Sequence, residues 1–394
     1  MFLSKKTSGQ IKTLRQQVEN FENIFDQAND AIFVIDIGDG RIHYTNKQAA
    51  VFLKYELIDL LTKSLFDLHP EEMLGRSSEI IADVWEKGGL VYRDIPFISS
   101  ENELLPVECS ARVIPFQDRP TVLIYARDIR ERIKLENEVL AQKALLEQKN
   151  KDITDSITYA STIQRAILPD ESLLQQAFEE FFIFYKPKDI VSGDFYWFNQ
   201  KGETKIIAAA DCTGHGVPGA LMSMIGNSVL NEIVIEKGIS DPSDILKALD
   251  EKFIRFKEER NFHDAMDIAI CRISPEGIAY SGSNRSLIIV NGEGLQEIKG
   301  CKRAIGSSEG LEEFKTTTLE PLPGSMLYIF SDGYADQFGG ELNKKFTSKR
   351  QKLLFERIYT QTSAVQKTII AQALEEWKGI HEQVDDVLVI GVRV

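Results

Sequence analysis

Apolar residues follow two different spacings along the first third of this 394-residue chain. Short runs rich in β-branched and aromatic residues, separated by turn-forming residues, predict five strands at 31–36, 41–45, 91–98, 104–115 and 121–126. A helical spacing of apolar residues predicts an amphipathic helix over 11–29, and helical pieces are expected over 47–87. The expected order is therefore a helix, two strands, helical pieces and three strands.

A long helix is expected next, because residues 129–168 contain neither glycine nor proline. Apolar residues recur in it every seven positions: Val139, Leu146, Ile153, Ala160 and Ile167. The complementary heptad positions are mostly polar: Gln142, Lys149, Ser156 and Ile163. This pattern predicts a weak, parallel, dimeric coiled coil. Because a marginal seam can hold two arrangements of similar energy, the helix is also suited to a switch, which is a hypothesis.

Aspartates stand beside strands expected in the C-terminal half of the chain. Three of them follow this pattern: Asp211 after 205–210, Asp332 after 326–330, and Asp385 before 387–392. In an antiparallel sheet the end of one strand lies beside the start of its neighbour, so these residues are expected to converge, and Asp194 could join them. Carboxylates that share a site need hard cations, and oxygen ligands favour Mg²⁺ or Mn²⁺. Two such ions would activate water for hydrolysis of a phosphate ester.

The composition limits which classes of partner and which cellular compartment are expected. A net charge of -14 disfavours nucleic acid and anionic lipid as partners, and 394 residues suggest two domains with a connector. The four cysteines lie far apart, so they are expected to be reduced and structural. No apolar run approaches the ~20 residues of a membrane span, and the first residues lack the apolar core of a signal peptide, so a cytoplasmic location without membrane contact is expected.

The N-terminal motifs resemble a PAS domain. The similarity rests on Ala31–Asp36, on Thr45 and Asn46 after the second strand, and on the closing segment 126–132, in that order. The resemblance implies a five-stranded antiparallel sheet with helices, acting as a sensor of small molecules, light or redox state, or as a ligand-free dimerisation module. No ligand is identified, and His43 and His69 are expected to be surface or partly buried residues rather than haem ligands.

The C-terminal motifs resemble the PPM family of metal-dependent phosphatases, in the bacterial branch typified by the sporulation stage II protein E phosphatase. The similarity rests on the segments around Asp194, Asp211, Asp332 and Asp385, in that order, and especially on the run 168–169, 184–187, 191–196 and 211–220. The resemblance implies an α-β-β-α sandwich that acts on phosphoserine or phosphothreonine in a protein, such as an anti-sigma-factor antagonist. It also implies two Mn²⁺ or Mg²⁺ ions held by Asp194, Asp211, a backbone carbonyl near Cys212, Asp332 and Asp385, with Asp386 as a further metal-site residue.

Other residues keep two interpretations. His215 is a candidate to protonate the leaving oxygen, and its alternative role is to hydrogen-bond its own loop. Arg285 could hold substrate phosphate, although a surface salt bridge is the expected role of a single arginine. Asp267, which opens the strand expected over 268–271, could be an extra metal ligand, but a structural role is favoured because no family motif matches it. The helix expected over 216–236 covers a sheet, and by family resemblance it could also be an activation switch.

The resulting α+β organisation has four parts: an N-terminal helix at 1–20, a PAS sensor domain at 21–131, a coiled-coil linker at 132–170 and a phosphatase domain at 171–394. The predicted function is a metal-dependent serine/threonine phosphatase, regulated by the PAS domain and homodimeric through linker and PAS domain. The alternative is a non-catalytic module that binds a phosphoprotein. A cyclase or kinase would need a phosphate-binding glycine loop or a purine-specificity motif, which the sequence lacks.

Overall fold

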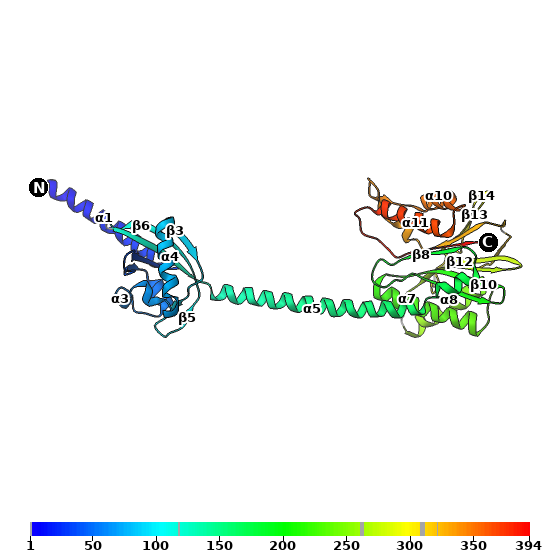
Figure 1. Ribbon diagram of the computed structural model, residues 1–394, viewed down its shortest axis with the longest axis horizontal. Helices are drawn as coiled ribbons and strands as arrows, with labels where there is room; N and C mark the ends of the chain where they lie inside the picture. The colour runs from blue at the N-terminus through cyan, green and yellow to red at the C-terminus, as the bar shows by residue number, and fades with distance from the viewer. Residues whose placement is uncertain (1, 117–118, 261–263, 308–311, 321) are drawn as a thin grey trace. The chain divides into compact units, whose positions relative to one another are not determined.

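The chain folds into two compact units, Met1–Gln148 and Lys149–Val394. A computed structural model describes residues 2–116, 119–260, 264–307, 312–320 and 322–394 (Figure 1). Helix α1 (Phe2–Asp26) comes first, and helix α5 (Arg130–Ile167) contains the boundary between the two units.

The N-terminal unit is built on one antiparallel sheet with the strand order β2-β1-β7-β6-β3. Its strands are β1 (Ala31–Asp36), β2 (Ile42–Thr45), β3 (Gly89–Tyr92), β6 (Val107–Phe116) and β7 (Arg119–Asp128). Between β2 and β3 lie helices α2 (Lys47–Leu53), α3 (Leu57–Leu60) and α4 (Leu74–Lys87), and the short helices η1 (Leu65–Leu68) and η2 (Glu71–Met73). The expected five-stranded antiparallel sheet with helices is confirmed.

One expected strand, 91–98, is divided in the structure. Strand β3 ends at Tyr92, and Phe97–Ile98 forms a separate strand, β4, which pairs with β5 (Leu104–Leu105) instead of with the main sheet. Pro96 lies between the two pieces. Because proline has no backbone N–H to donate to a neighbouring strand, the run cannot continue as one strand within the sheet.

His69 lies inside the N-terminal core, where it is buried more completely than the surface or partly buried position expected for it. Only 5% of the residue is exposed, its Nδ1 is 2.6 Å from Ser77 Oγ, and its ring stacks on Phe97. The cavity beside it measures only about 10 Å³, at the lower limit for a single water molecule. His43 is only half-buried and lies 3.5 Å from an oxygen of Asp36.

Helix α5 is exposed along most of its length and becomes buried near its C-terminal end. Apolar side chains on its exposed part include Leu135, Val139, Leu146 and Ile153. Ser161 and Gln164 are buried instead. Within the part of the chain that the structure describes, none of the helices is both long enough and apolar enough to cross a membrane.

The C-terminal unit contains two five-stranded antiparallel sheets, ordered β15-β12-β11-β10-β9 and β14-β13-β16-β19-β8. The first consists of β9 (Phe195–Lys201), β10 (Thr204–Cys212), β11 (Met266–Ser274), β12 (Gly277–Ser283) and β15 (Thr317–Leu319). The second consists of β8 (Phe181–Lys186), β13 (Leu287–Asn291), β14 (Gly294–Ile298), β16 (Met326–Phe330) and β19 (Val387–Arg393). Apolar side chains such as Tyr280, Ile329 and Ile390 form one core with members from both sheets.

Helices cover the outer face of each sheet (Figure 1). Helices α7 (Gly216–Leu230) and α8 (Pro242–Arg260) pack on the first sheet, and α10 (Ser348–Ile358) and α11 (Ser363–Lys378) pack on the second. The expected α-β-β-α sandwich is therefore confirmed. The helix expected over 216–236 changes at residue 231, where the π-helical segment η3 (Asn231–Glu236) follows α7.

Candidate active site

Strand ends from both sheets place a group of aspartates together. Asp211 lies near the end of β10, Asp332 follows β16, and Asp385 precedes β19. Because β16 pairs antiparallel with β19, with Phe330 opposite Val389, the end of one strand meets the start of the other. All three aspartates line an open cavity of about 340 Å³.

Asp194 lies beside this group but is almost completely buried, with 2% of the residue exposed. It precedes β9, in which Phe195 pairs with Ala210 of β10, so the register places Asp194 next to Asp211. Its Oδ2 has no hydrogen-bond partner among the described residues. Burial, followed by the charge of Asp211, raises the pKa of Asp194 well above its ordinary value, while the Ser331 hydroxyl opposes the rise. The Ser331 hydroxyl alone does not offset burial, so this carboxylate needs a further partner that stabilises its negative charge if it is to stay ionised.

Asp386 has a different role from its neighbour Asp385. Its Oδ1 accepts a hydrogen bond from the backbone N–H of Lys188 at 2.7 Å, and its Oδ2 accepts one from Gly193 at 2.7 Å. A Cβ at Gly193 would lie 2.5 Å from Gly214 O and 3.2 Å from Cys212 O, so the loop that contains Gly193 runs directly against the end of β10. These two bonds favour a role for Asp386 in holding the loop before Asp194, rather than a place among direct metal ligands.

Arg285 lies inside the acidic group, not on the surface as expected. Only 12% of its side chain is exposed, and its Nη2 is 2.6 Å from Asp211 Oδ2, 2.9 Å from Asp332 Oδ2 and 3.3 Å from Asp267 Oδ2. Burial raises the pKa of Asp211 to about 8, and the Arg285 charge limits that rise. Burial disfavours the charged guanidinium, but the surrounding carboxylates outweigh it and raise the pKa of Arg285.

Asp267, expected to be structural, is also part of this site. It lines the same cavity and accepts a hydrogen bond at 2.8 Å from Asn284 Nδ2 as well as pairing with Arg285. Burial raises its pKa as well. Its position at the start of a predicted strand was the signal in the sequence, and the structure places it opposite Asp211 in the register of β10 and β11.

His215 lines the same cavity, where its ring is held by two charged neighbours. Its Nδ1 is 2.8 Å from Asp189 Oδ2, and its Nε2 is 3.0 Å from Lys188 Nζ. Because a carboxylate accepts and an ammonium donates, this pairing assigns the proton of the neutral ring to Nδ1. About half of the His215 side chain is exposed. Asp189 and Lys188 were not foreseen from the sequence, where they read only as polar residues ahead of the Ser192–Asp194 loop.

Gln164 near the end of α5 connects that helix to the acidic site. Its Nε2 donates to Ser192 O at 2.6 Å and to Ser223 Oγ at 2.8 Å, and its Oε1 accepts from Ser192 N–H at 3.1 Å. Ser192 belongs to the loop that carries Asp194, and Ser223 belongs to α7. One buried amide therefore binds the long helix, the loop and α7 together, and nothing in the heptad pattern distinguished it from other glutamines.

The donor set fits hard divalent cations by its chemistry, since it consists of carboxylates, among them the buried Asp194 with one orphaned carboxylate oxygen. As arranged in the structure, however, the described residues contain no group of three or more His, Cys, Asp or Glu side chains that could hold a metal ion. The guanidinium of Arg285 lies between Asp211, Asp267 and Asp332. Its single positive charge stands where a cation would be expected.

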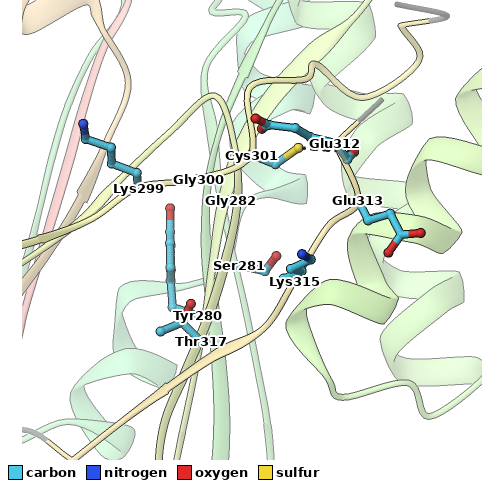
Figure 2. A pocket seen from close by; sticks show the side chains of 10 residues that line it. All are labelled: Tyr280, Ser281, Gly282, Lys299, Gly300, Cys301, Glu312, Glu313, Lys315 and Thr317. Atoms are coloured by element: carbon cyan, nitrogen blue, oxygen red, sulfur yellow. Dashed lines mark hydrogen bonds between the residues drawn. The ribbon is translucent and has the colours of Figure 1, made fainter. Parts of the chain in front are cut away.

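A second, polar cavity of about 570 Å³ lies beside β12 and contains none of the predicted site residues (Figure 2). Two lysines and two glutamates line it, Lys299, Lys315, Glu312 and Glu313, so their charges cancel. The buried Oγ of Ser281 has no hydrogen-bond partner among the described residues. Without a net charge or a cluster of catalytic groups, this cavity indicates no reaction.

Comparisons with known proteins identify both units. The family model of stage II sporulation protein E (SpoIIE) matches residues 201–394, and a PAS domain model matches residues 19–86. The solved PP2C domain of SiaA from Pseudomonas aeruginosa is 34% identical, with a TM-score of 0.58, and the match covers 62% of this chain and 98% of that domain. A search of curated proteins found no match.

Two further solved structures are more distant. The PP2C phosphatase domain of SpoIIE from Bacillus subtilis, solved with a fragment of its regulatory domain, is 12% identical over 82% of this chain and 89% of that chain, with a TM-score of 0.46. The PAS domain of an HTR-like protein from Haloarcula marismortui is 18% identical over 31% of this chain and 99% of that chain, with a TM-score of 0.29.

Proposed function

The chain belongs to the stage II sporulation protein E (SpoIIE) family of PP2C-type serine/threonine phosphatases, and from that premise we propose how its PAS domain and acidic site work together. The observation that supports a metal-dependent hydrolase in this chain is the meeting of Asp194, Asp211, Asp332 and Asp385 at strand ends from two sheets. We assign the sensor to residues 21–131, the linker to 132–170 and catalysis to 171–394.

In this proposal two Mn²⁺ or Mg²⁺ ions are held by Asp194, Asp211, the Cys212 carbonyl, Asp332 and Asp385. When bound, they supply a water of lowered pKa and neutralise the charge of the phosphoryl group. Asp386 keeps the loop before Asp194 in place through its two backbone bonds. Burial keeps bulk water from competing for Asp194, whose residue is 2% exposed.

His215 is the proposed acid for the leaving serine or threonine oxygen. Asp189 accepts a hydrogen bond from Nδ1–H, which fixes the ring; Nε2 can give a proton to the leaving oxygen only when the ring is doubly protonated and Lys188 no longer donates to it. Lys188 Nζ beside Nε2 keeps a positive charge at the position where the leaving oxygen gains negative charge. The substrate class is a phosphoserine or phosphothreonine in a protein, and an anti-sigma-factor antagonist is our proposal by family resemblance alone.

Regulation is proposed to reach the site through Gln164. This residue joins α5 to the Ser192–Asp194 loop and to α7, so a shift of the helix must move a proposed metal ligand or break buried hydrogen bonds. Val139, Leu146 and Ile153 stand seven residues apart and are exposed, which supports a parallel dimer through α5 and the PAS domain. A cytoplasmic location, where ATP-dependent kinases phosphorylate serine and threonine, completes the proposal.

The test is hydrolysis of a small aryl phosphate with and without Mn²⁺. We expect metal-dependent turnover in the wild type, and its loss in Asp211→Asn and Asp332→Asn by about a thousandfold or more. Asp244→Asn is the matched control, because this exposed aspartate on α8 pairs with Lys247 and lies in another part of the unit. Phosphoprotein binding without turnover under any condition would instead support the non-catalytic alternative.

A further inference from the structure

Arg285 makes an unusual set of contacts for a buried arginine. One nitrogen, Nη2, lies within 3.3 Å of carboxylate oxygens on Asp211, Asp332 and Asp267. The Nε atom is buried and has no hydrogen-bond partner among the described residues. The side chain therefore brings its charge to the acidic site through one nitrogen, while another donor stays unsatisfied.

The carboxylates need a positive charge beside them, but the hydrogen-bond geometry of Arg285 toward them is poor. Arginine binds a carboxylate best when two of its nitrogens face the two oxygens in a planar fork. Here Nη2 has two hydrogens for three carboxylates, and an unpaired buried N–H costs free energy. A single positive charge also faces three carboxylates, so it neutralises only part of their charge.

The backbone of Arg285 is fixed, so only its side chain is free to move. Its carbonyl oxygen accepts a hydrogen bond from Tyr280 Oη at 2.6 Å. Asn284 before it has a φ of 53°, in the left-handed region, and donates its N–H to Cys301 O at 2.7 Å. A Cβ at Gly300 would lie 2.3 Å from Arg285 O, and Figure 2 shows Gly300 near Tyr280 and Gly282. A fixed backbone confines any exchange of partners at this residue to its side chain.

We propose that Arg285 is a displaceable internal counter-ion that competes with divalent metal for Asp211 and Asp332. The inference rests on the metal site proposed above. With metal absent, the guanidinium holds the carboxylates together and stabilises the fold; with metal present, it must leave them, and its charge then lies beside the position of a phosphoryl group. Arg285 therefore weakens the affinity of the site for metal and strengthens the metal-free protein.

The experiment is calorimetric titration of Mn²⁺ into the full chain, with thermal unfolding in EDTA as a second readout. We expect Arg285→Met, which keeps the apolar stem but removes the charge, to bind Mn²⁺ on the order of tenfold more tightly and to unfold at a lower temperature in EDTA. Arg303→Met is the matched control, because Arg303 is also partly buried and pairs with Asp250 of α8. That control is expected to lose thermal stability while keeping the Mn²⁺ affinity of the wild type.

Each outcome decides the inference. A wild type that binds Mn²⁺ while Arg285→Met binds with equal or weaker affinity overturns this inference alone. A wild type that binds no Mn²⁺ overturns the proposed metal site and this inference with it. If Arg285→Met does not fold in EDTA, Arg285→Lys decides: its ammonium cannot reach three carboxylates as the guanidinium does, so a higher Mn²⁺ affinity than wild type supports the inference, and an equal or lower affinity overturns it.

Discussion

The core of the N-terminal unit and the acidic site of the C-terminal unit both bury titratable side chains, but only the acidic site places a charged partner among them. In the first, burial lowers the pKa of His69 to about 4 and raises the pKa of Cys109 to about 12, so both are neutral at pH 7. In the second, Asp211 and Asp332 lie against the charged Arg285.

The difference between these regions is informative about function. A core that only has to be stable can leave its polar groups neutral, with a single partner such as Ser77 for His69. Placing several carboxylates in one site costs desolvation free energy, and such a cost is typical of sites where cations or substrate need those charges. The four predictions below test this contrast, starting from the largest expected effect.

The acidic site should tolerate no added volume. A Cβ at Gly333, directly after Asp332, would lie 1.9 Å from Asp386 O and 3.3 Å from Asp385 Cβ. We expect Gly333→Ala to lower the free energy of unfolding by about 3 kcal/mol or more, because the backbone of the neighbouring strand would have to move. Gly292→Ala, with no atom within 4 Å of the added Cβ, should change it by less than about 1 kcal/mol. Guanidinium unfolding compares the two, and equal stabilities would show that the strand end is not rigid.

Loss of the Gln164 amide should disturb the acidic site through the loop that carries Asp194. Gln164→Leu leaves the backbone N–H and C=O of Ser192 without their partner, so we expect a loss of about 2 kcal/mol in unfolding free energy and a marked loss of activity. Gln200→Leu is the control, since that exposed side chain donates to Gly202 O in its own turn. A stable, fully active Gln164→Leu variant would contradict the proposed route of regulation.

The N-terminal core should weaken as the solution becomes acidic. The folded pKa of His69, about 4, lies below its unfolded value, so the unfolded chain binds the proton more readily and stability falls as pH decreases from about 6.5 towards 4. Between pH 7 and pH 5 the expected loss is about 2 kcal/mol. The pKa values of Tyr92 and Cys109 in the same core are raised, so neither titrates in this range.

Unfolding of the N-terminal unit followed by the fluorescence of Trp85 measures this loss. His69→Gln should be less stable at pH 7 but should lose the dependence on pH that is due to this residue. His43→Gln, at a half-buried position near Asp36, is the control that should retain it. A His69→Gln variant with the same pH dependence as the wild type would mean that another group is responsible.

The smallest effect is expected at Asp189, which contacts His215 but does not line the cavity as described. Asp189→Asn keeps a hydrogen-bonding side chain but loses the charge that holds the ring, so hydrolysis of a phosphoserine peptide should fall about tenfold, with an altered pH profile. An aryl phosphate has a leaving group that needs no proton, so its hydrolysis should change much less. Equal losses on both substrates would remove Asp189 and His215 from proton transfer.

Much of the fold followed from local patterns in the sequence. The strands around residues 31–36 and 326–330 were predicted by runs of apolar residues, and the aspartates after or before such strands could be placed at sheet edges. The break at Pro96 was missed because two short apolar runs were read as one strand. The long helix over α5 was predicted by the absence of glycine and proline.

The contacts that give the acidic site its properties were decided only by the tertiary structure. Arg285 meets Asp211 and Asp332, which lie 74 and 47 residues away in the chain, and Gln164 meets Ser192 at a separation of 28. Local propensity and periodicity fix which segments become strands and which face they bury, because those preferences act between near neighbours. Which charged side chain enters a shared cavity depends on how two sheets and a helix pack together, and therefore on contacts that no local pattern contains.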